Sequence, residues 1–182
     1  MLSSAVAMAD GLSYSYVQAN YQEIDIDFGG GADADGDGFA VGGSAEIGED
    51  WFIFAAYSTF DLESVVDYTT LTAGAGYHSD VSAKTDWFAT VGYAEAEVDA
   101  SGFGSADDSG FGISLGLRSM VNDNLELYGN IGYVDLGDGA DGTTIGAGLW
   151  YTVSGNLALG LGAEFDDDVT GYGIGLRLYF DK

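Results

Sequence analysis

The stretch from Gly171 to Phe180 constrains the fold most, because its residues divide by type at every second position. One register is wholly apolar and has an aromatic residue at each end: Tyr172, Ile174, Leu176, Leu178 and Phe180. The other register is small or polar and carries a charge: Gly171, Gly173, Gly175, Arg177 and Tyr179. Successive side chains of a β-strand point to opposite faces. This pattern is typical of a strand with lipid outside and a polar interior inside.

The rest of the chain repeats the plan, and the pattern predicts ten strands, at 12–26, 39–47, 51–60, 69–78, 87–98, 111–121, 125–136, 143–153, 157–165 and 171–180. Short turns at 48–50, 80–85, 122–124 and 154–156 alternate with connections at 28–38, 61–68, 99–109, 137–142 and 166–170, which are mostly longer, acidic and glycine-rich. This alternation predicts an all-β fold, a transmembrane up-and-down antiparallel β-barrel with both termini on the short-turn side.

Aromatic residues of the outward register test this prediction. The short-turn rim receives Trp51, Tyr77, Trp87, Tyr151 and Phe180, and the opposite rim receives Phe39, Tyr57, Tyr93, Phe111, Tyr133, Phe165 and Tyr172. Two aromatic girdles around an aliphatic band suit the two interfaces of a bilayer. Only the first strand departs, because Val17, Ala19 and Tyr21 indicate one register whereas Leu12, Tyr14 and Tyr16 indicate the other, and a bulge there is one interpretation.

Composition narrows the class further. The 182 residues include 30 acidic and four basic residues, so a nucleic-acid partner is not expected. A hydrophobic content of 47% argues against intrinsic disorder, and the sequence has no apolar run of about 18 residues that would predict a transmembrane helix. The absence of proline favours unbroken strand ladders, and the absence of cysteine excludes disulfides and thiolate metal sites.

The inward register predicts a charge network in the lumen. Two of the four basic residues, Arg118 and Arg177, face inward, with Glu46, Glu126 and Glu164 as candidate partners. Arg118 and Glu126 flank one turn and are expected to be diagonal neighbours. A charge in a narrow lumen needs a partner or water. We therefore favour a paired network that closes the barrel, and the alternative is a path for ions. Ten strands lie near the closed end of the size range of barrels.

Several motifs carry a family resemblance. They are Ala9-Asp10-Gly11-Leu12-Ser13-Tyr14-Ser15-Tyr16-Val17, Phe52-Ile53-Phe54 with Tyr57-Ser58-Thr59, and Gly74-Ala75-Gly76-Tyr77-His78. On these the chain resembles the small outer-membrane β-barrels of Gram-negative bacteria, OmpX-like and porin-like, and most closely a proteobacterial family whose mature chains begin ADGLSYxYV. The resemblance implies an outer-membrane location, periplasmic termini and insertion by the barrel-assembly machinery. Gly175, Leu178 and Phe180 match the C-terminal insertion signal of such proteins.

The N-terminus resembles the end of a secretory signal. Ala7-Met8-Ala9 fits the small-x-small cleavage pattern, which makes Asp10 the first mature residue. We therefore predict a signal-peptide remnant at 1–9 and a single outer-membrane barrel domain at 10–182. A disordered N-terminal extension is the alternative interpretation. Because a closed barrel leaves no free strand edge, a monomer is expected.

The acidic connections raise the question of a metal. Asp33, Asp35 and Asp37 match the first ligand positions of a calcium loop, but Ser44 stands where the bidentate glutamate is expected. A Ca²⁺ or Mg²⁺ site there is a hypothesis, and simple hydration of an acidic surface is the favoured interpretation. No other cofactor is predicted. Divalent ions that bridge these acidic residues to lipopolysaccharide phosphates are a further hypothesis.

The function classes follow from these features. The single histidine, His78, has no nucleophile that the sequence pairs with it, so no enzyme activity is expected. The favoured function is a non-catalytic barrel that serves envelope integrity or surface interaction. A narrow porin-like channel for small solutes or ions is the first alternative, because many interior residues are glycine. A soluble barrel that carries apolar ligands is the second, and it requires the apolar register inside.

Overall fold

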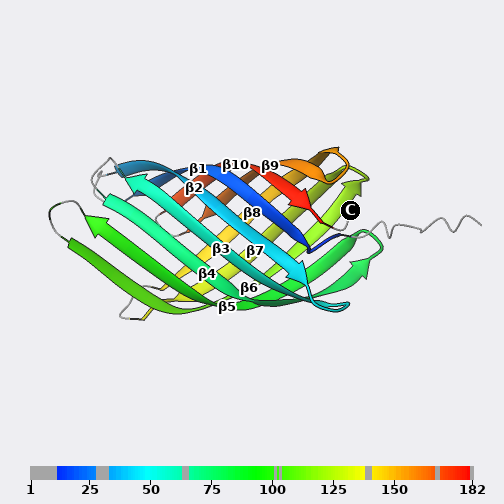
Figure 1. The fold of residues 1–182 in the computed structure, drawn as a ribbon, viewed down its shortest axis with the longest axis horizontal. Helices are drawn as coiled ribbons and strands as arrows, with labels where there is room; N and C mark the ends of the chain where they lie inside the picture. The colour runs from blue at the N-terminus through cyan, green and yellow to red at the C-terminus, as the bar shows by residue number, and fades with distance from the viewer. Residues whose placement is uncertain are drawn as a thin grey trace, which may run out of the picture.

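The protein forms one closed barrel of ten antiparallel strands (Figure 1). The computed structural model describes residues 12–27, 33–62, 66–100, 102, 104–137, 141–166 and 169–180. The strands are β1 (Tyr16–Asp27), β2 (Asp33–Glu46), β3 (Trp51–Leu62), β4 (Val66–Ser82), β5 (Thr85–Ala100), β6 (Gly104–Asn122), β7 (Leu125–Asp135), β8 (Asp141–Ser154), β9 (Leu157–Phe165) and β10 (Val169–Tyr179). Each strand pairs with its sequence neighbours, and β1 closes the barrel against β10. The prediction of a ten-stranded up-and-down barrel is confirmed.

The two ends of the barrel differ. The end that carries the connections at 47–50, 83–84, 123–124 and 155–156 is called the turn end, and the opposite end is called the loop end. The turn-end connections also tie neighbouring hairpins together, because the backbone N–H groups of Met120 and Thr152 donate to the carbonyls of Lys84 and Asn124, both at 2.8 Å. The C-terminal end of β10 lies at the turn end (Figure 1).

The membrane-facing wall has the predicted sidedness. Large apolar side chains of the outward register are exposed on every strand, for example Phe111 at 69%, Ile113 at 60% and Ile174 at 58%. Buried polar and charged side chains of the opposite register face the lumen, among them Arg118, Glu126 and Arg177. A soluble carrier of apolar ligands requires the apolar register inside. In the lipid-facing part of this barrel the apolar register lies outside. Within the described residues, no helix is long and apolar enough to cross a membrane.

The first strand is regular, and the predicted bulge is wrong. β1 pairs residue by residue with both β10 and β2, without a shift in register. Tyr16 faces the lumen, where its ring lies against the Arg177 guanidinium. The conflict in the sequence arose because Tyr14 and Tyr16 are inward residues, whereas Val17 and Ala19 face outward and are exposed.

The strands extend further at the loop end than the sequence predicts. Residues 33–38, most of 61–68 and most of 99–109 were expected as loops, but they belong to β2 and to β3–β6. In this extension β2 and β3 carry acidic residues outside and apolar residues such as Leu62 inside, where Leu62 packs beside Ile24 of β1 at Gly36. A Cβ atom added at Gly36 would lie 2.6 Å from Leu62 Cδ2, which shows how tightly this interior is packed. The acidic outward register was mistaken for loop composition.

Candidate functional site: the lumen and its two mouths

A buried ion cluster lies in the lumen near the turn end. Arg118 Nε donates to Glu126 Oε1 at 2.8 Å, and Arg177 Nη1 lies 3.5 Å from the same oxygen. The Tyr179 hydroxyl donates to Glu126 Oε2 at 2.9 Å. Arg118 and Glu126 are diagonal neighbours, since Glu126 pairs with Met120 in the β6–β7 register. One carboxylate from β7 is therefore held by two arginines, from β6 and β10.

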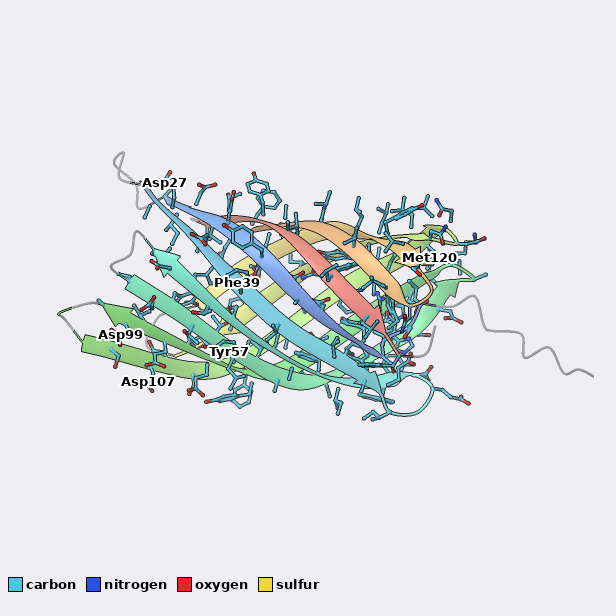
Figure 2. The ribbon with its side chains drawn as sticks, turned by 45° about the horizontal axis from the view of Figure 1, so that its top comes forward. Asp27, Phe39, Tyr57, Asp99, Asp107 and Met120 are labelled. Carbon is cyan, nitrogen blue, oxygen red and sulfur yellow. The ribbon has the colours of Figure 1, made fainter. Side chains whose placement is uncertain are left out.

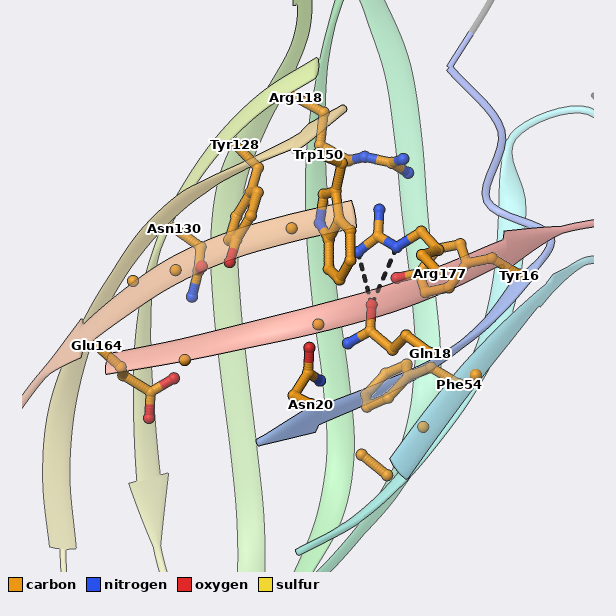
Figure 3. Close-up of a pocket in the computed structure, with 18 of the residues that line it drawn as sticks. Tyr16, Gln18, Asn20, Phe54, Arg118, Tyr128, Asn130, Trp150, Glu164 and Arg177 are labelled. Atoms are coloured by element: carbon orange, nitrogen blue, oxygen red, sulfur yellow. Dashed lines mark hydrogen bonds between the residues drawn. The ribbon is translucent and has the colours of Figure 1, made fainter. Parts of the chain in front are cut away.

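Arg177 is fixed on all sides. Its guanidinium carbon lies 4.0 Å from the ring centroids of both Tyr16 and Trp150, so the cation sits between two aromatic faces. Its Nε and Nη2 atoms donate to Gln18 Oε1 at 3.0 and 2.7 Å (Figure 3). Cation–π contacts of this kind are strongest where water is excluded. Arg177 thus links β10, on which it lies, to β1 and β8 through its side-chain contacts.

The N-terminal segment closes the turn end. Residues 13–15, here called the N-terminal plug, are buried, and Tyr14 is only 2% exposed. The Tyr14 ring stacks on His78 at 4.0 Å between centroids, and the Arg118 guanidinium lies 4.3 Å from the ring. Burial raises the pKa of the Tyr14 phenol, which therefore stays neutral. The plug fills the lumen beneath the ion cluster.

Glu46 holds this plug. Its Oε1 accepts from the Tyr14 backbone N–H, and its Oε2 accepts from the Ser15 hydroxyl, both at 3.3 Å. The Ser15 hydroxyl also accepts from the Glu46 backbone N–H at 3.2 Å. Glu46 was expected as a partner of the luminal arginines, but its height along the barrel places it beside the plug and 3.9 Å from His78 instead.

Several buried polar atoms near the turn end have no hydrogen-bond partner among the described residues. Among the described residues, buried side-chain atoms without a hydrogen-bond partner include the Tyr14 hydroxyl, both ring nitrogens of His78 and both Nη atoms of Arg118. His78 Nδ1 does lie 3.5 Å from Asp86 Oδ2. Unpaired buried donors reduce stability by about 1–3 kcal/mol each, and they occur both beside the plug, at Tyr14 and His78, and in the ion cluster, at Arg118.

The lumen contains a cavity of about 390 Å³ that borders the ion cluster and extends toward the loop end. Glutamine and asparagine side chains line it from β1 and β7, namely Gln18, Asn20, Gln22 and Asn130. Glu164, on β9, projects into the same space, apart from the two arginines (Figure 3). The described residues form no ion pair with Glu164. The structure therefore joins three of the five predicted network residues and separates Glu46 and Glu164 from them.

The outer face of the loop end carries a belt of carboxylates. This acidic belt comprises Glu23, Asp25, Asp27, Asp35, Asp37, Asp61, Asp67, Glu95, Glu97, Asp99, Asp107, Asp135 and Asp141. In Figure 2 its members Asp27, Asp99 and Asp107 lie at the end opposite Met120, beyond Phe39 and Tyr57. Several members are directly opposed across neighbouring strands, as in Asp61 with Asp67. Like charges at such positions destabilise a sheet unless ions or water separate them.

The segment for which a calcium loop was a hypothesis is part of a strand. Asp33, Asp35 and Asp37 belong to strand β2, where Asp35 and Asp37 point outward and Gly36 points inward. An extended strand differs from the loop geometry that wraps a calcium ion in the matching motif. In the described part of the chain, no group of three or more acidic, histidine or cysteine side chains is placed to hold a metal ion.

Comparison with known proteins agrees with this architecture. Residues 1–152 match the family model of the outer membrane protein β-barrel domain. The chain belongs to this family. Its members are outer-membrane proteins, and the protein is therefore located in the outer membrane. No protein of curated function matches the sequence.

Solved structures with a TM-score of 0.50 or more support the fold alone. The translocator domain of the autotransporter NalP from Neisseria meningitidis is 13% identical, with a TM-score of 0.52 over 93% of this chain and 89% of that chain. The transport unit of the autotransporter AIDA-I from Escherichia coli is 8% identical, with a TM-score of 0.50 over 93% and 91%. Ail, the attachment invasion locus protein of Yersinia pestis, is 14% identical, with a TM-score of 0.47 over 91% and 97%.

Other predicted positions can also be placed. Of the insertion-signal residues, Leu178 faces outward and Gly175 lines the lumen, while Phe180 is exposed directly after β10. The signal-peptide remnant at 1–9 lies outside the described residues. Sequence reasoning missed the plug, although Tyr14 shares the inward register of Tyr16 and Gln18 and could have been read from it.

Proposed function

We propose that the protein is a non-catalytic, integral outer-membrane barrel that is closed at its periplasmic end and serves envelope integrity or surface interaction through its acidic extracellular end. The observation that carries this proposal is the packing at the turn end. Tyr14, Trp150 and Tyr179 are at most 4% exposed there, and they surround the Arg118–Glu126–Arg177 cluster. A lumen filled with rings and paired charges leaves no continuous water path.

The acidic belt defines the proposed contact with the membrane. It lies just beyond outward aromatic residues such as Phe39 and Phe111, at the height where lipopolysaccharide phosphates surround an outer-membrane barrel. Carboxylates and phosphates repel each other, and divalent cations can bridge them. We propose that Ca²⁺ or Mg²⁺ shared between the belt and lipopolysaccharide stabilises the barrel in the outer leaflet. Insertion by the barrel-assembly machinery and a monomeric state belong to the same proposal.

Single-channel recording of the refolded protein in a planar bilayer tests the closure. Folding is verified first by the heat-dependent shift in gel mobility that closed barrels show. A folded protein without steady conductance supports the proposal. Steady conductance that tolerates voltage would overturn it.

A narrow channel is the second candidate, and one observation favours it. The luminal cavity reaches Tyr14 of the plug, around which buried polar atoms of Tyr14, His78 and Arg118 have no hydrogen-bond partner among the described residues. If the plug leaves, only the cluster of Arg118, Glu126 and Arg177 obstructs the lumen. Recordings in which the wild-type protein opens in brief, discrete events would favour this candidate over permanent closure.

A further inference from the structure

The luminal cavity has one wall without side chains, formed by β8, β9 and β10. Six inward glycines of these strands line it: Gly146, Gly160, Gly162, Gly171, Gly173 and Gly175. Several are directly opposed across strands, as Gly173 is to Gly162 and Gly175 is to Gly160. A glycine inside a strand often marks a site where a ligand approaches the backbone closely. This wall, here called the glycine trough, leaves the space that the cavity occupies.

Carboxamide side chains border the glycine trough on both sides. Asn20 and Gln22 come from β1, which pairs with β10, and Asn130 comes from β7, which pairs with β8 (Figure 3). These three side chains make no hydrogen bond with the described residues, so their polar atoms are available to a guest. A carboxamide group both donates and accepts, and so does a hydroxyl group. The borders of the trough therefore suit a guest that carries several hydroxyl groups.

Aromatic rings line the opposite wall. Phe54 comes from β3 and Phe88 from β5, and both lie along the wall against a glycine. An added Cβ atom would lie 2.9 Å from Phe54 Cζ at Gly74 and 2.6 Å from Phe88 Cε1 at Gly116. The face of an aromatic ring is apolar and carries partial negative charge. This wall therefore suits the C–H groups of a guest.

The charges that line the cavity balance. They are those of Arg118, Arg177, Glu126 and Glu164. Both arginines contact Glu126, whereas Glu164 forms no ion pair with a described residue. Glu164 is also exposed although it faces inward, so water reaches it. A guest with a net charge therefore gains no overall attraction, but hydroxyl groups can donate charge-assisted hydrogen bonds to the Glu164 carboxylate.

We propose that the lumen binds a neutral hexose sugar that enters from the loop end. The apolar face of the sugar ring packs on Phe54, and two adjacent hydroxyl groups donate to Glu164. The remaining hydroxyl groups bond with the carboxamides of Asn20, Gln22 and Asn130. The cavity volume of about 390 Å³ lies within the range of about 300–1,000 Å³ that small-molecule sites occupy. This inference goes beyond the proposed closure of the turn end and does not depend on it.

The probes are glucose and galactose, each titrated calorimetrically into the folded barrel in a detergent without a sugar headgroup. Glucuronate and galacturonate are the matched anionic sugars, and glycerol controls for a general effect of hydroxyl groups in the solvent. A second readout is the fluorescence of Trp150, which lines the cavity, in a protein that carries W51F and W87F. Trp51 and Trp87 belong to the outward register, so removing them leaves a luminal reporter.

We expect saturable binding of at least one of the two hexoses, with a change in Trp150 fluorescence and no response to glycerol. The corresponding anionic sugar should bind at least about tenfold more weakly, because its carboxylate meets Glu164 without an unpaired cation nearby. Glu164→Gln should weaken binding of the neutral hexose at least about tenfold, since hydrogen bonds to ionised groups are the stronger ones.

A pair of glycine substitutions tests the trough separately from Glu164. Gly171→Leu fills the trough, where the nearest atom would lie 3.5 Å from an added Cβ atom, and should abolish hexose binding. Gly112→Leu is the matched control, because Gly112 has a similar space of 3.6 Å on β6 but is not among the residues that line the cavity. It should change affinity by less than about twofold, since it contacts none of the binding groups.

Three results would overturn the proposal. They are no binding of either hexose by the folded wild type, equal or tighter binding of the anionic sugars, and unchanged affinity in Gly171→Leu. If Glu164→Gln does not fold, the two glycine variants still decide the matter. Conductance measurements test closure of the turn end independently, so failure of one proposal is distinguishable from failure of the other.

Discussion

The turn end and the loop end of this barrel differ in which register is apolar, the outward one or the inward one. At the turn end the interior is polar, and charges such as Arg118 and Glu126 are buried and paired while apolar side chains face outward. At the loop end the interior formed by β1–β4 is apolar, with Ile24 and Leu62 packed beside Gly36, and the carboxylates of the acidic belt face outward. One continuous sheet thus carries both arrangements.

The difference shows that the surrounding medium decides which register is apolar. Below the aromatic residues of the loop end the outside is lipid, where a charge is costly and an apolar side chain is favoured. Above them the outside is water, so the strands resemble a soluble sheet with an apolar interior. The inversion of sidedness along one strand therefore marks where the bilayer ends.

The largest effect is expected from the ion cluster. Glu126→Gln leaves two buried arginines without their carboxylate and should lower the free energy of unfolding by about 3–5 kcal/mol. Urea titration of the refolded barrel, followed by gel mobility, measures this change. Glu164→Gln is the matched control, because Glu164 lies in the same lumen outside the cluster, and it should cost less than about 1 kcal/mol. Equal losses in both variants would contradict the distinction between them.

Two separate substitutions to lysine on one strand test whether the outward register changes from lipid-facing to water-facing along the strand. Ile113 and Asp107 both face outward on β6, but Ile113 belongs to the lipid-facing part and Asp107 to the acidic belt. Ile113→Lys should destabilise the barrel by about 2–4 kcal/mol in lipid vesicles. Asp107→Lys should be within about 0.5 kcal/mol of the wild type, since it is a surface substitution and removes a like charge opposite Glu97. Similar losses at both positions would show that the bilayer extends over the acidic belt.

Removal of the Tyr14 side chain tests whether the N-terminal plug closes the lumen to ions separately from its contribution to the stability of the barrel. Tyr14→Ala should cost about 1–3 kcal/mol, because Tyr14 precedes β1 and its loss breaks no strand pairing. It should increase ion conductance in planar bilayers, because the ring that covers Arg118 and His78 is gone. Tyr14→Phe keeps the ring and serves as the control, which should remain silent. A silent Tyr14→Ala barrel would mean that the ion cluster alone closes the lumen.

The smallest effect is expected from divalent cations at the acidic belt. In vesicles that contain lipopolysaccharide, EDTA should lower the thermal stability of the barrel by the equivalent of about 1 kcal/mol or less, since exposed charge interactions are weak. In phosphatidylcholine vesicles the shift should be smaller still, because those lipids carry no net charge. An unchanged melting temperature with EDTA in lipopolysaccharide vesicles would count against bridging by divalent ions.

Much of the lumen could be predicted because strand alternation is a local property. The period of two in Gly171–Phe180 assigned Arg177 to the lumen and Ile174 to lipid without any knowledge of neighbouring strands. The same rule placed Arg118 and Glu126 on the inward face of the two strands that flank a single turn, where diagonal contact follows from hairpin geometry. The extra length of β3–β6 escaped prediction because an acidic outward register resembles a hydrated loop.

The sequence by itself determined the all-β class, the ten strands and which side chains face inward, since these depend only on alternation and on turns between adjacent strands. Only the tertiary structure decided which of the three glutamates meets the arginines, because the height of each along the barrel depends on the accumulated stagger of all ten strands. Closure of β1 on β10 likewise brings Gln18 to Arg177 across 159 residues and places Tyr14 in the turn-end mouth. Such contacts between the two ends of the chain have no local signal in a sequence.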